Sequence, residues 1–372
     1  MKPLRLGTSL ALAALCLAGC AAPEHATAPT AETRVSLMTW NVENLFDTQH
    51  DAGKQDYTFV PLSEKRAHPE YLAACATIEV QRWREECEQT DWTEALLAEK
   101  LKRLSAVIRQ VDNGRGPDIL LLEEVENSAV LEQLNARLGP AGYGTRVLLE
   151  GQDERGIDTA VLSRLPQWGQ PILHAVPYQA MGSDDPARVG KTRGILEVRL
   201  LLPGGQKASV FAVHLPSSGA PGYLREQAVN YLAELQRALP ADVLPIVGGD
   251  FNINAGEERA NGYIAKGLAK HWSVSQLIGC NGCKGSYYYH TKREWSFFDM
   301  LLFPPAMASA AGFNGWQVDP ASIRLAHQSP YQVNRWGTPA RFDDGKQAEG
   351  VSDHWPLYAQ IFTRTPGVAR HD

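Results

Sequence analysis

The chain has 372 residues, of which 44% are hydrophobic and 21% are charged, a composition typical of a globular protein rather than a disordered or fibrous one. Its net charge of −6 excludes a uniformly basic surface that would bind nucleic acid through charge alone. That charge still allows an enzyme that contacts a few phosphates through a local group of cations.

The N-terminal segment carries Lys2 and Arg5, followed by an apolar run that is too short to span a bilayer. This pattern predicts a signal peptide over residues 1–19. The run ends in Leu-Ala-Gly-Cys, which resembles a bacterial lipobox, so we expect a lipid on Cys20 that anchors the protein to a membrane of the bacterial cell envelope. Ala21 favours the outer membrane over the inner one. Without a lipid on Cys20, the protein would be secreted.

The rest of the chain reads as one domain with flexible ends. Residues 20–34 are rich in Ala, Pro and Thr and predict a flexible tether. The expected domain covers residues 35–364, and a tail follows over residues 365–372. Within the domain, residues 48–92 carry many charges and little periodicity, and we interpret them as an insertion.

Four cysteines follow the expected lipidation site: Cys75, Cys87, Cys280 and Cys283. An even number of cysteines in an oxidising compartment favours disulfides. Three pairings exist, of which Cys75 with Cys87 and Cys280 with Cys283 close the shortest loops. A zinc site built from all four thiolates is the alternative, because the Cys-Asn-Gly-Cys segment has suitable ligand spacing.

Short apolar runs predict β-strands along the whole domain. They cover residues 35–40, 118–125, 145–150, 158–164, 193–202, 208–215, 244–249, 297–303 and 355–362. The runs on either side of Pro-Gly-Gly-Gln-Lys predict a hairpin. Apolar residues at helical spacing predict helices over residues 93–111, 128–138 and 225–239. Interspersed strands and helices with one hairpin favour α/β layers over a purely parallel sheet.

Polar side chains stand where many of these strands begin or end. They are Asn41, Glu123, Glu124, His214, Asp250, Asn252, Asp299, Asp353 and His354. Groups at the ends of buried strands can converge on a ligand at one rim of a sheet. Oxygen ligands without a Cys/His group suit Mg²⁺ or Ca²⁺, and histidines beside acids suit proton transfer near neutral pH. Together they predict metal-assisted hydrolysis of a phosphoester.

Seven segments resemble, in order, motifs of the endonuclease/exonuclease/phosphatase superfamily, which includes DNase I, exonuclease III and neutral sphingomyelinases. They are TWNVENLFD (39–47), PDILLLEEVEN (117–127), DERGIDTAVLSR (153–164), VHLPSS (213–218), GGDFN (248–252), SFFDMLLF (296–303) and SDHWPL (352–357). The resemblance implies a DNase I-like, four-layer α/β/β/α sandwich, in which two mixed sheets pack face to face with helices outside.

The resemblance also implies which residues hold the metal and the water. Asn41 and Glu124 match the positions that hold a divalent cation, and Asp353 matches a residue near it. We expect Mg²⁺ there, with Mn²⁺ or Ca²⁺ as alternatives. Asp250 and Asn252 match the pair around the attacking water and the scissile phosphate.

Two histidines are expected to be catalytic. His354 matches a histidine that acts as a base or contacts the phosphate, and Asp299 matches the acid that orients it. Neighbouring side chains on a strand diverge, so Asp353 is not the expected partner of His354. His214 matches a second histidine of DNase I, and Asp158 is its candidate partner.

The chain departs from the family pattern at two places. Glu123 stands where the family commonly has Gln, and we expect it to face solvent or to cap a turn; otherwise it would alter metal affinity. The segment HLPSSG lacks an Arg that often follows the first Ser in bacterial relatives. Arg155, Arg193 and Arg225 are the candidate substitutes for this phosphate contact, because Arg binds phosphate oxygens in a bidentate way.

The expected enzyme is a monomeric nuclease that acts on DNA or RNA. A phospholipid or sphingomyelin phosphodiesterase is the alternative, because a lipid anchor and the aromatic segment SYYYH (286–290) with Trp295 suit a membrane interface. Aromatic side chains stack equally well on nucleobases. An inositol-phosphate phosphatase is a further alternative, and a non-catalytic binding lipoprotein is the alternative of another class. A competent residue at every expected catalytic position disfavours the last of these.

Overall fold

The computed structural model describes residues 31–139, 142–342 and 350–365. The expected signal peptide, the lipidation site Cys20 and most of the expected tether and tail lie outside these ranges. Residues 32–364 form one unit. Within the described ranges, no helix combines the length and the apolar character that crossing a membrane requires.

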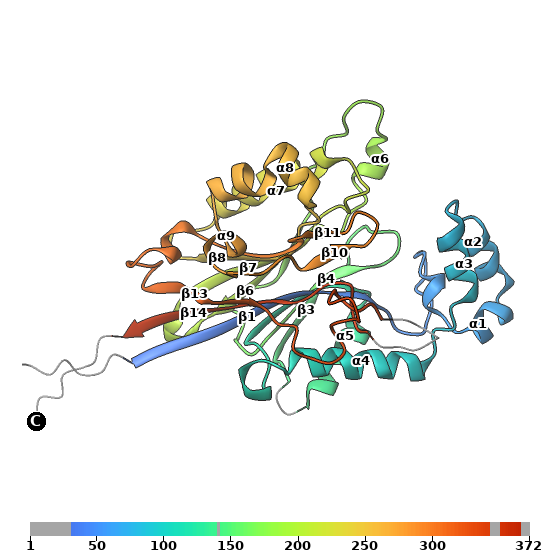
Figure 1. Cartoon of the computed structure of the whole chain (residues 1–372), viewed down its shortest axis with the longest axis horizontal. Helices are drawn as coiled ribbons and strands as arrows, with labels where there is room; N and C mark the ends of the chain where they lie inside the picture. The colour runs from blue at the N-terminus through green and yellow to red at the C-terminus, as the bar shows by residue number, and fades with distance from the viewer. Residues whose placement is uncertain (1–30, 140–141, 343–349, 366–372) are drawn as a thin grey trace, which may run out of the picture. The chain divides into compact units, whose positions relative to one another are not determined.

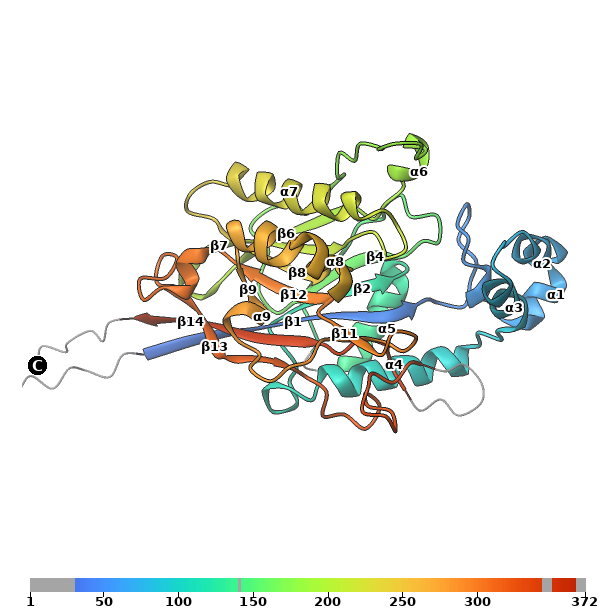
Figure 2. The same ribbon diagram turned by 45° about the horizontal axis from the view of Figure 1, so that its top comes forward.

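The first sheet, here called sheet A, has six strands in the order β13-β14-β1-β2-β4-β3. Their bounds are β1 Ala31–Leu45, β2 Ile119–Val125, β3 Thr145–Leu148, β4 Asp158–Ser163, β13 Trp316–Leu325 and β14 Leu357–Thr365. β1 runs parallel to β2, whereas β4 runs antiparallel to β2 and to β3. Figure 2 shows β14 beside β1, so the two ends of the domain meet in the middle of this sheet.

The expectation of a flexible tether over residues 20–34 is wrong for its last four residues, because residues 31–34 belong to β1. The side chain of Arg34 explains the longer strand. Its Nη1 atom donates to Asp319 Oδ2 at 2.8 Å and to Gln360 Oε1 at 2.9 Å. These contacts hold the start of β1 against β13 and β14.

The second sheet, sheet B, has the strand order β5-β6-β7-β8-β12-β9. Their bounds are β5 Ile172–His174, β6 Ile195–Leu201, β7 Lys207–His214, β8 Leu244–Asp250, β9 Ser273–Val274 and β12 Asp299–Phe303. β6 and β7 form the predicted hairpin, and β7 runs parallel to β8. A separate two-stranded sheet consists of β10 Tyr287–Tyr289 and β11 Glu294–Ser296.

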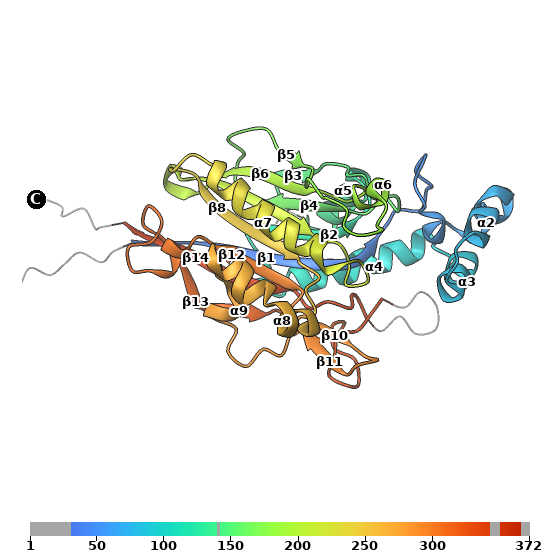
Figure 3. The same cartoon turned by 90° about the horizontal axis from the view of Figure 1, so that it is seen from above.

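The two sheets pack face to face, with helices on their outer faces (Figures 1 and 3). α4 Glu94–Ile108 and α5 Ser128–Leu138 cover sheet A, and α7 Gly222–Ala238 covers sheet B. Alternate residues of one strand serve different layers: Leu121 of β2 enters the core between the sheets, whereas Leu120 and Leu122 pack in the core under α4 and α5. The predicted four-layer α/β/β/α sandwich is confirmed.

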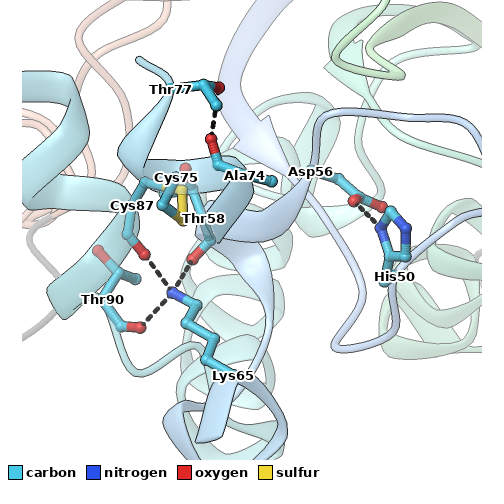
Figure 4. The surroundings of a disulfide bond; sticks show 9 residues. All are labelled: His50, Asp56, Thr58, Lys65, Ala74, Cys75, Thr77, Cys87 and Thr90. Atoms are coloured by element: carbon cyan, nitrogen blue, oxygen red, sulfur yellow. Dashed lines mark hydrogen bonds and ion pairs between the residues drawn. A yellow bond between two sulfur atoms is a disulfide. The ribbon is translucent and has the colours of Figure 1, made fainter. Parts of the chain in front are cut away.

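The segment interpreted as an insertion folds into short helices: η1 Tyr57–Phe59, α1 Leu62–Ala67, α2 Pro69–Ala76 and α3 Gln81–Gln89. The Cys75–Cys87 disulfide joins α2 to α3. The ammonium group of Lys65 is fully buried and donates to the carbonyls of Thr58, Cys87 and Thr90 at 2.7–3.1 Å (Figure 4). The side chain therefore supplies hydrogen bonds in place of a large apolar core.

Cys280 and Cys283 form a second disulfide. The four sulfur atoms thus bond to one another in pairs, so the alternative of a four-thiolate zinc site is wrong. The described ranges also contain the short α-helices α6 Pro186–Val189, α8 Ala255–Asn261 and α9 Ser275–Ile278.

Candidate active site

Strand register brings three expected catalytic residues together in sheet B. His214 at the end of β7 lies opposite Asp250 at the end of β8, and Asp250 lies opposite Asp299 at the start of β12. Residues directly opposite each other on neighbouring strands share a face of the sheet. One row across three strands therefore carries an imidazole and two carboxylates. All three residues are buried.

Sheet A supplies the groups that meet this row. Asn41 lies on β1, and its Nδ2 atom donates to Glu124 Oε1 at 3.2 Å and to Asp250 Oδ2 at 3.0 Å. Glu124 has a left-handed backbone with φ of 65°, where the register of β2 with β4 shifts. Such a bulge re-aims a side chain, and here it turns Glu124 towards Asn41. Asn41 thereby links one carboxylate of each sheet.

Asp250 accepts hydrogen bonds from Asn41 of sheet A and from the loop that follows β8. Its Oδ1 atom accepts a hydrogen bond from the backbone N–H of Asn252 at 2.7 Å, and Asn252 Nδ2 donates to Leu215 O. Burial raises the pKa of Asp250 to about 7, against the opposing charge of His354. A carboxyl group with this pKa can accept or release a proton near neutral pH.

His354 and Asp299 form the expected pair. His354 Nδ1 lies 2.8 Å from Asp299 Oδ2, and both side chains are buried. Asp353 instead approaches the other ring nitrogen, with Oδ1 3.9 Å from Nε2. Burial by itself would lower the pKa of His354, but Asp299, Asp250 and Asp353 together raise it well above its usual value. The ring is therefore cationic at neutral pH.

The expected pairing of His214 with Asp158 is wrong. Asp158 Oδ1 accepts the backbone N–H of Gly151 at 2.8 Å, and among the residues that the structure describes His214 Nδ1 has no hydrogen-bond partner. Asp158 opens β4 of sheet A, whereas His214 ends β7 of sheet B. Burial, followed by the charges of Arg193 and Arg155, holds the pKa of His214 well below its usual value, so this ring is neutral.

The three candidate phosphate-binding arginines have different environments. Arg225 is fully buried in α7 and donates to Pro216 O, Ser217 O and Ala220 O and to the carboxylate of Glu257. The expectation that it contacts phosphate is wrong, because its donors hold the loop before α7 and the start of α8.

Arg193 and Arg155 lie close enough to His214 to affect its pKa. Arg193 is buried and lies 3.0 Å from Asp153 Oδ2, while its Nε atom has no hydrogen-bond partner within the described part of the chain. Arg155 is exposed. Both remain candidates for binding phosphate.

Glu123 does not face solvent or cap a turn, so that expectation is also wrong. The side chain is fully buried and accepts a hydrogen bond from Thr39 Oγ1 at 3.1 Å. Burial, with added repulsion from Asp299 and Asp250, raises its pKa well above the usual value. Burial thus disfavours the charged form of Glu123.

Sequence reasoning missed two cations beside the site. Lys100 of α4 is fully buried and donates to Glu43 O at 2.9 Å and Val351 O at 2.8 Å. Lys100 stands three residues after Leu97, within the apolar stripe of the helix, and this position could have indicated that its side chain is buried. Arg341 contacts the carboxylate of Glu43, and its Nε lies 3.9 Å from Asp353 Oδ2. No motif marks Arg341.

The donor set at Asn41 fits a hard divalent cation. Across the described residues, no group of three or more His, Cys, Asp and Glu side chains is arranged to hold a metal. The site instead offers the carboxylate of Glu124 and the amide of Asn41, whose Nδ2 atom donates to Glu124 and whose Oδ1 atom accepts the backbone N–H of Glu43. Hard divalent cations such as Mg²⁺ can bind through one or two carboxylates while keeping several waters, so the residues present fit a cation of this kind.

An α/β/β/α sandwich that carries a His–Asp pair, carboxylates and an amide at one rim fits the chemistry of phosphoester hydrolysis. The family model of the Endonuclease/Exonuclease/phosphatase family matches residues 38–354. The chain belongs to this family, whose enzymes typically use divalent metals. No curated protein sequence matches the chain.

Solved structures resemble the chain over most of its length. The endonuclease/exonuclease/phosphatase from Beutenbergia cavernae DSM 12333 is 16% identical, with 90% of this chain and 73% of that one covered and a TM-score of 0.53. A family protein from Bacteroides thetaiotaomicron is 12% identical, with 92% and 100% covered and a TM-score of 0.52. D. rerio TDP2 complexed with single strand DNA product is 17% identical, with 88% and 99% covered and a TM-score of 0.49. At these identities, the likeness concerns the fold alone.

Proposed function

We propose that this phosphoester hydrolase is a divalent-metal-dependent nuclease that cleaves phosphodiester bonds of DNA or RNA. The observation that carries the proposal is the His354–Asp299 pair, in which the other ring nitrogen, Nε2, lies 3.9 Å from both Asp250 Oδ2 and Asp353 Oδ1. A cationic donor and a carboxyl group of near-neutral pKa therefore face the same small volume. One can contact the phosphate while the other takes a proton from water.

In this mechanism, Asp250 orients the attacking water and accepts its proton. The phosphorus–oxygen bond to the leaving alcohol breaks, and that oxygen takes a proton from solvent. Asn252, held by Leu215 O, lies beside Asp250 and contacts the phosphate. His354 directs Nε2 at the phosphate oxygens, and Asp299 fixes the ring at Nδ1 and keeps it charged. A divalent cation, for which we propose Mg²⁺, would be held by Asn41 and Glu124 with Asp353 nearby, and would polarise a phosphoryl oxygen.

The proposal is tested by incubating the purified protein with plasmid DNA, RNA, sphingomyelin and inositol phosphates, each with Mg²⁺ or with EDTA. We expect cleavage of nucleic acid that EDTA abolishes and that His354→Ala lowers by about 10²–10⁴-fold. His271→Ala, at an exposed histidine, is the matched control and keeps full activity. Cleavage of sphingomyelin alone would show that the enzyme is a lipid phosphodiesterase and not a nuclease. Hydrolysis of none of the substrates would refute the proposal.

We also propose that Cys20 carries a lipid that holds the enzyme on the bacterial outer membrane. The Leu-Ala-Gly-Cys segment and the following Ala21 support this proposal. Metabolic labelling with a fatty acid tests it: label should enter the full chain and be lost in Cys20→Ser. Equal labelling of both chains would contradict lipidation at this cysteine.

A further inference from the structure

The hairpin of β10 and β11 places one tyrosine ring, that of Tyr287, beside the proposed catalytic histidine. The ring of Tyr287 lies 5.1 Å from that of His354 and stacks on Phe298 at 4.6 Å. Tyr287 also forms a β-bridge with His354. Tyr289 follows two residues later on the same strand, so both rings share one face of β10. Tyr289 is 43% exposed.

Two cations accompany these rings. Arg341 contacts Glu43 and lies close to Asp353, yet 60% of its side chain is exposed, so it can still bind an anion. Lys292 Nζ lies 5.8 Å from the ring centroid of Tyr289. Burial raises the pKa of Tyr287 to about 12, with Asp353 and Arg341 among the charges that act on it. Tyr287 and Arg341 thus border the site at His354, and Lys292 accompanies Tyr289 two residues further along β10.

We infer that Tyr287, Tyr289 and Arg341 bind the nucleotides next to the scissile phosphate, with an unpaired base stacked on Tyr289. This inference rests on the proposed nuclease function. Residues two apart on a strand are separated by about 6.6 Å, so Tyr289 can reach a nucleotide beyond the one nearest His354. Arg341 and Lys292 then contact phosphates.

The same features select against other ligands. A base inside a duplex is covered on both faces by its neighbours, so only an unpaired or terminal base can stack on Tyr289. A quaternary ammonium headgroup needs aromatic faces without competing cations, whereas here Lys292 and Arg341 border the rings. The subsite therefore favours single strands over duplexes and over choline lipids.

The test compares two polymers that carry the same phosphates. One is a 20-nucleotide oligothymidylate, and the other has a base-free tetrahydrofuran at every position. We expect the wild-type protein to prefer the base-bearing polymer in kcat/KM by on the order of fivefold to a hundredfold. Tyr289→Ala brings this ratio close to one, whereas Tyr289→Phe, which keeps the ring, preserves it. Trp83→Ala, at an exposed aromatic residue of the insertion, is the matched control and keeps the ratio.

Arg341→Met should raise KM for both polymers alike, because it removes a phosphate contact and no base contact. A second readout avoids catalysis: fluorescence anisotropy in EDTA gives the Kd of each labelled polymer. We expect Tyr289→Ala to weaken binding of oligothymidylate by about fivefold or more. Tyr289→Phe should bind like the wild-type protein.

The outcomes separate this inference from the nuclease proposal. Cleavage with an unchanged polymer ratio in Tyr289→Ala overturns the subsite while leaving the nuclease intact. Absence of cleavage with base-dependent binding in EDTA overturns the nuclease and keeps the subsite as a binding site. If Tyr289→Ala instead weakens binding to sphingomyelin–phosphatidylcholine vesicles and leaves oligonucleotide binding unchanged, the hairpin is a membrane contact and the inference is overturned.

Discussion

Asp299 Oδ2 lies 2.8 Å from His354 Nδ1, although 55 positions separate the two residues in the chain. Asp299 opens a strand of sheet B, and His354 lies just before β14 of sheet A. Asp299→Asn keeps the size of the side chain but removes its charge, so we expect kcat to fall by about 10²–10⁴-fold. Steady-state kinetics on the cleaved substrate measures the loss.

The two side chains should act as one unit. Asp299→Asn combined with His354→Ala should be about as slow as His354→Ala alone, because the acid acts only through the ring. The pKa of His354, followed by NMR, should fall in Asp299→Asn. Losses that multiply in the double variant would contradict a positioning role for Asp299.

Lys100 joins two segments that carry the candidate site. Its ammonium group binds Glu43 O, two residues after Asn41, and Val351 O, two residues before Asp353. Lys100→Met leaves two buried carbonyls without a donor, so we expect the free energy of unfolding to fall by about 2–5 kcal/mol and kcat to fall with it. Lys102→Met, at an exposed position of the same helix, should change either quantity little. Similar effects of both substitutions in urea denaturation would refute this role.

Arg225 is predicted to stabilise the fold rather than to bind substrate. Arg225→Met removes a buried guanidinium and leaves Glu257 and three carbonyls without it. We expect a loss of about 3–5 kcal/mol in the free energy of unfolding, measured by urea denaturation. Arg237→Met on the exposed face of α7 is the control. If Arg225→Met instead has normal stability and a raised KM, the side chain binds substrate and the predicted structural role is wrong.

Glu197 should make stability depend on pH in the acid range. Against the effect of burial, hydrogen bonds from His174, Arg199 and Ser209 lower the pKa of this carboxyl group to about 2. As pH falls, Glu197 binds a proton at about pH 4.5 in the unfolded chain but only near pH 2 in the folded chain. The contribution of Glu197 to the free energy of unfolding is therefore complete above about pH 4.5 and is lost as pH falls towards 2.

Glu197→Gln tests this dependence. The wild-type protein should exceed the variant by about 2–3 kcal/mol in free energy of unfolding at pH 6, and the difference should shrink steadily below pH 4.5. Urea denaturation at pH 3, 4.5 and 6 measures it. A difference that stays constant over this range would show that the carboxylate charge has no such role.

How far the sequence predicts the fold depends on how each strand is buried. Strands covered on both faces, such as β2 with its run of Ile and Leu, have an unmistakable apolar pattern and were predicted. β13 was missed because it is partly exposed and its register with β14 shifts after Asp319. The helices of the insertion were missed because they bury few apolar residues and depend on a disulfide and on Lys65.

The site shows a similar division. The His354–Asp299 pair follows from motif resemblance, since both residues belong to short segments with a recognisable pattern. Side-chain direction does not follow from such segments: Asp158, Glu123 and Arg225 all lie in or near them, yet each faces a partner that only the folded chain supplies. Arg341 belongs to no motif and depends on long-range packing alone.

The candidate site takes Asn41 and Glu124 from one sheet and Asp250 and Asp299 from the other, so its geometry depends on how the sheets are aligned. The apolar layer that sets this alignment attracts without directional bonds, so Asn41, which donates to Glu124 in one sheet and to Asp250 in the other, supplies a directional contact between them. Catalytic activity should thus depend on the alignment of the two sheets and should be lost on heating at a lower temperature than the secondary structure. Loss of activity and loss of helical signal would then report two separate events in the same molecule.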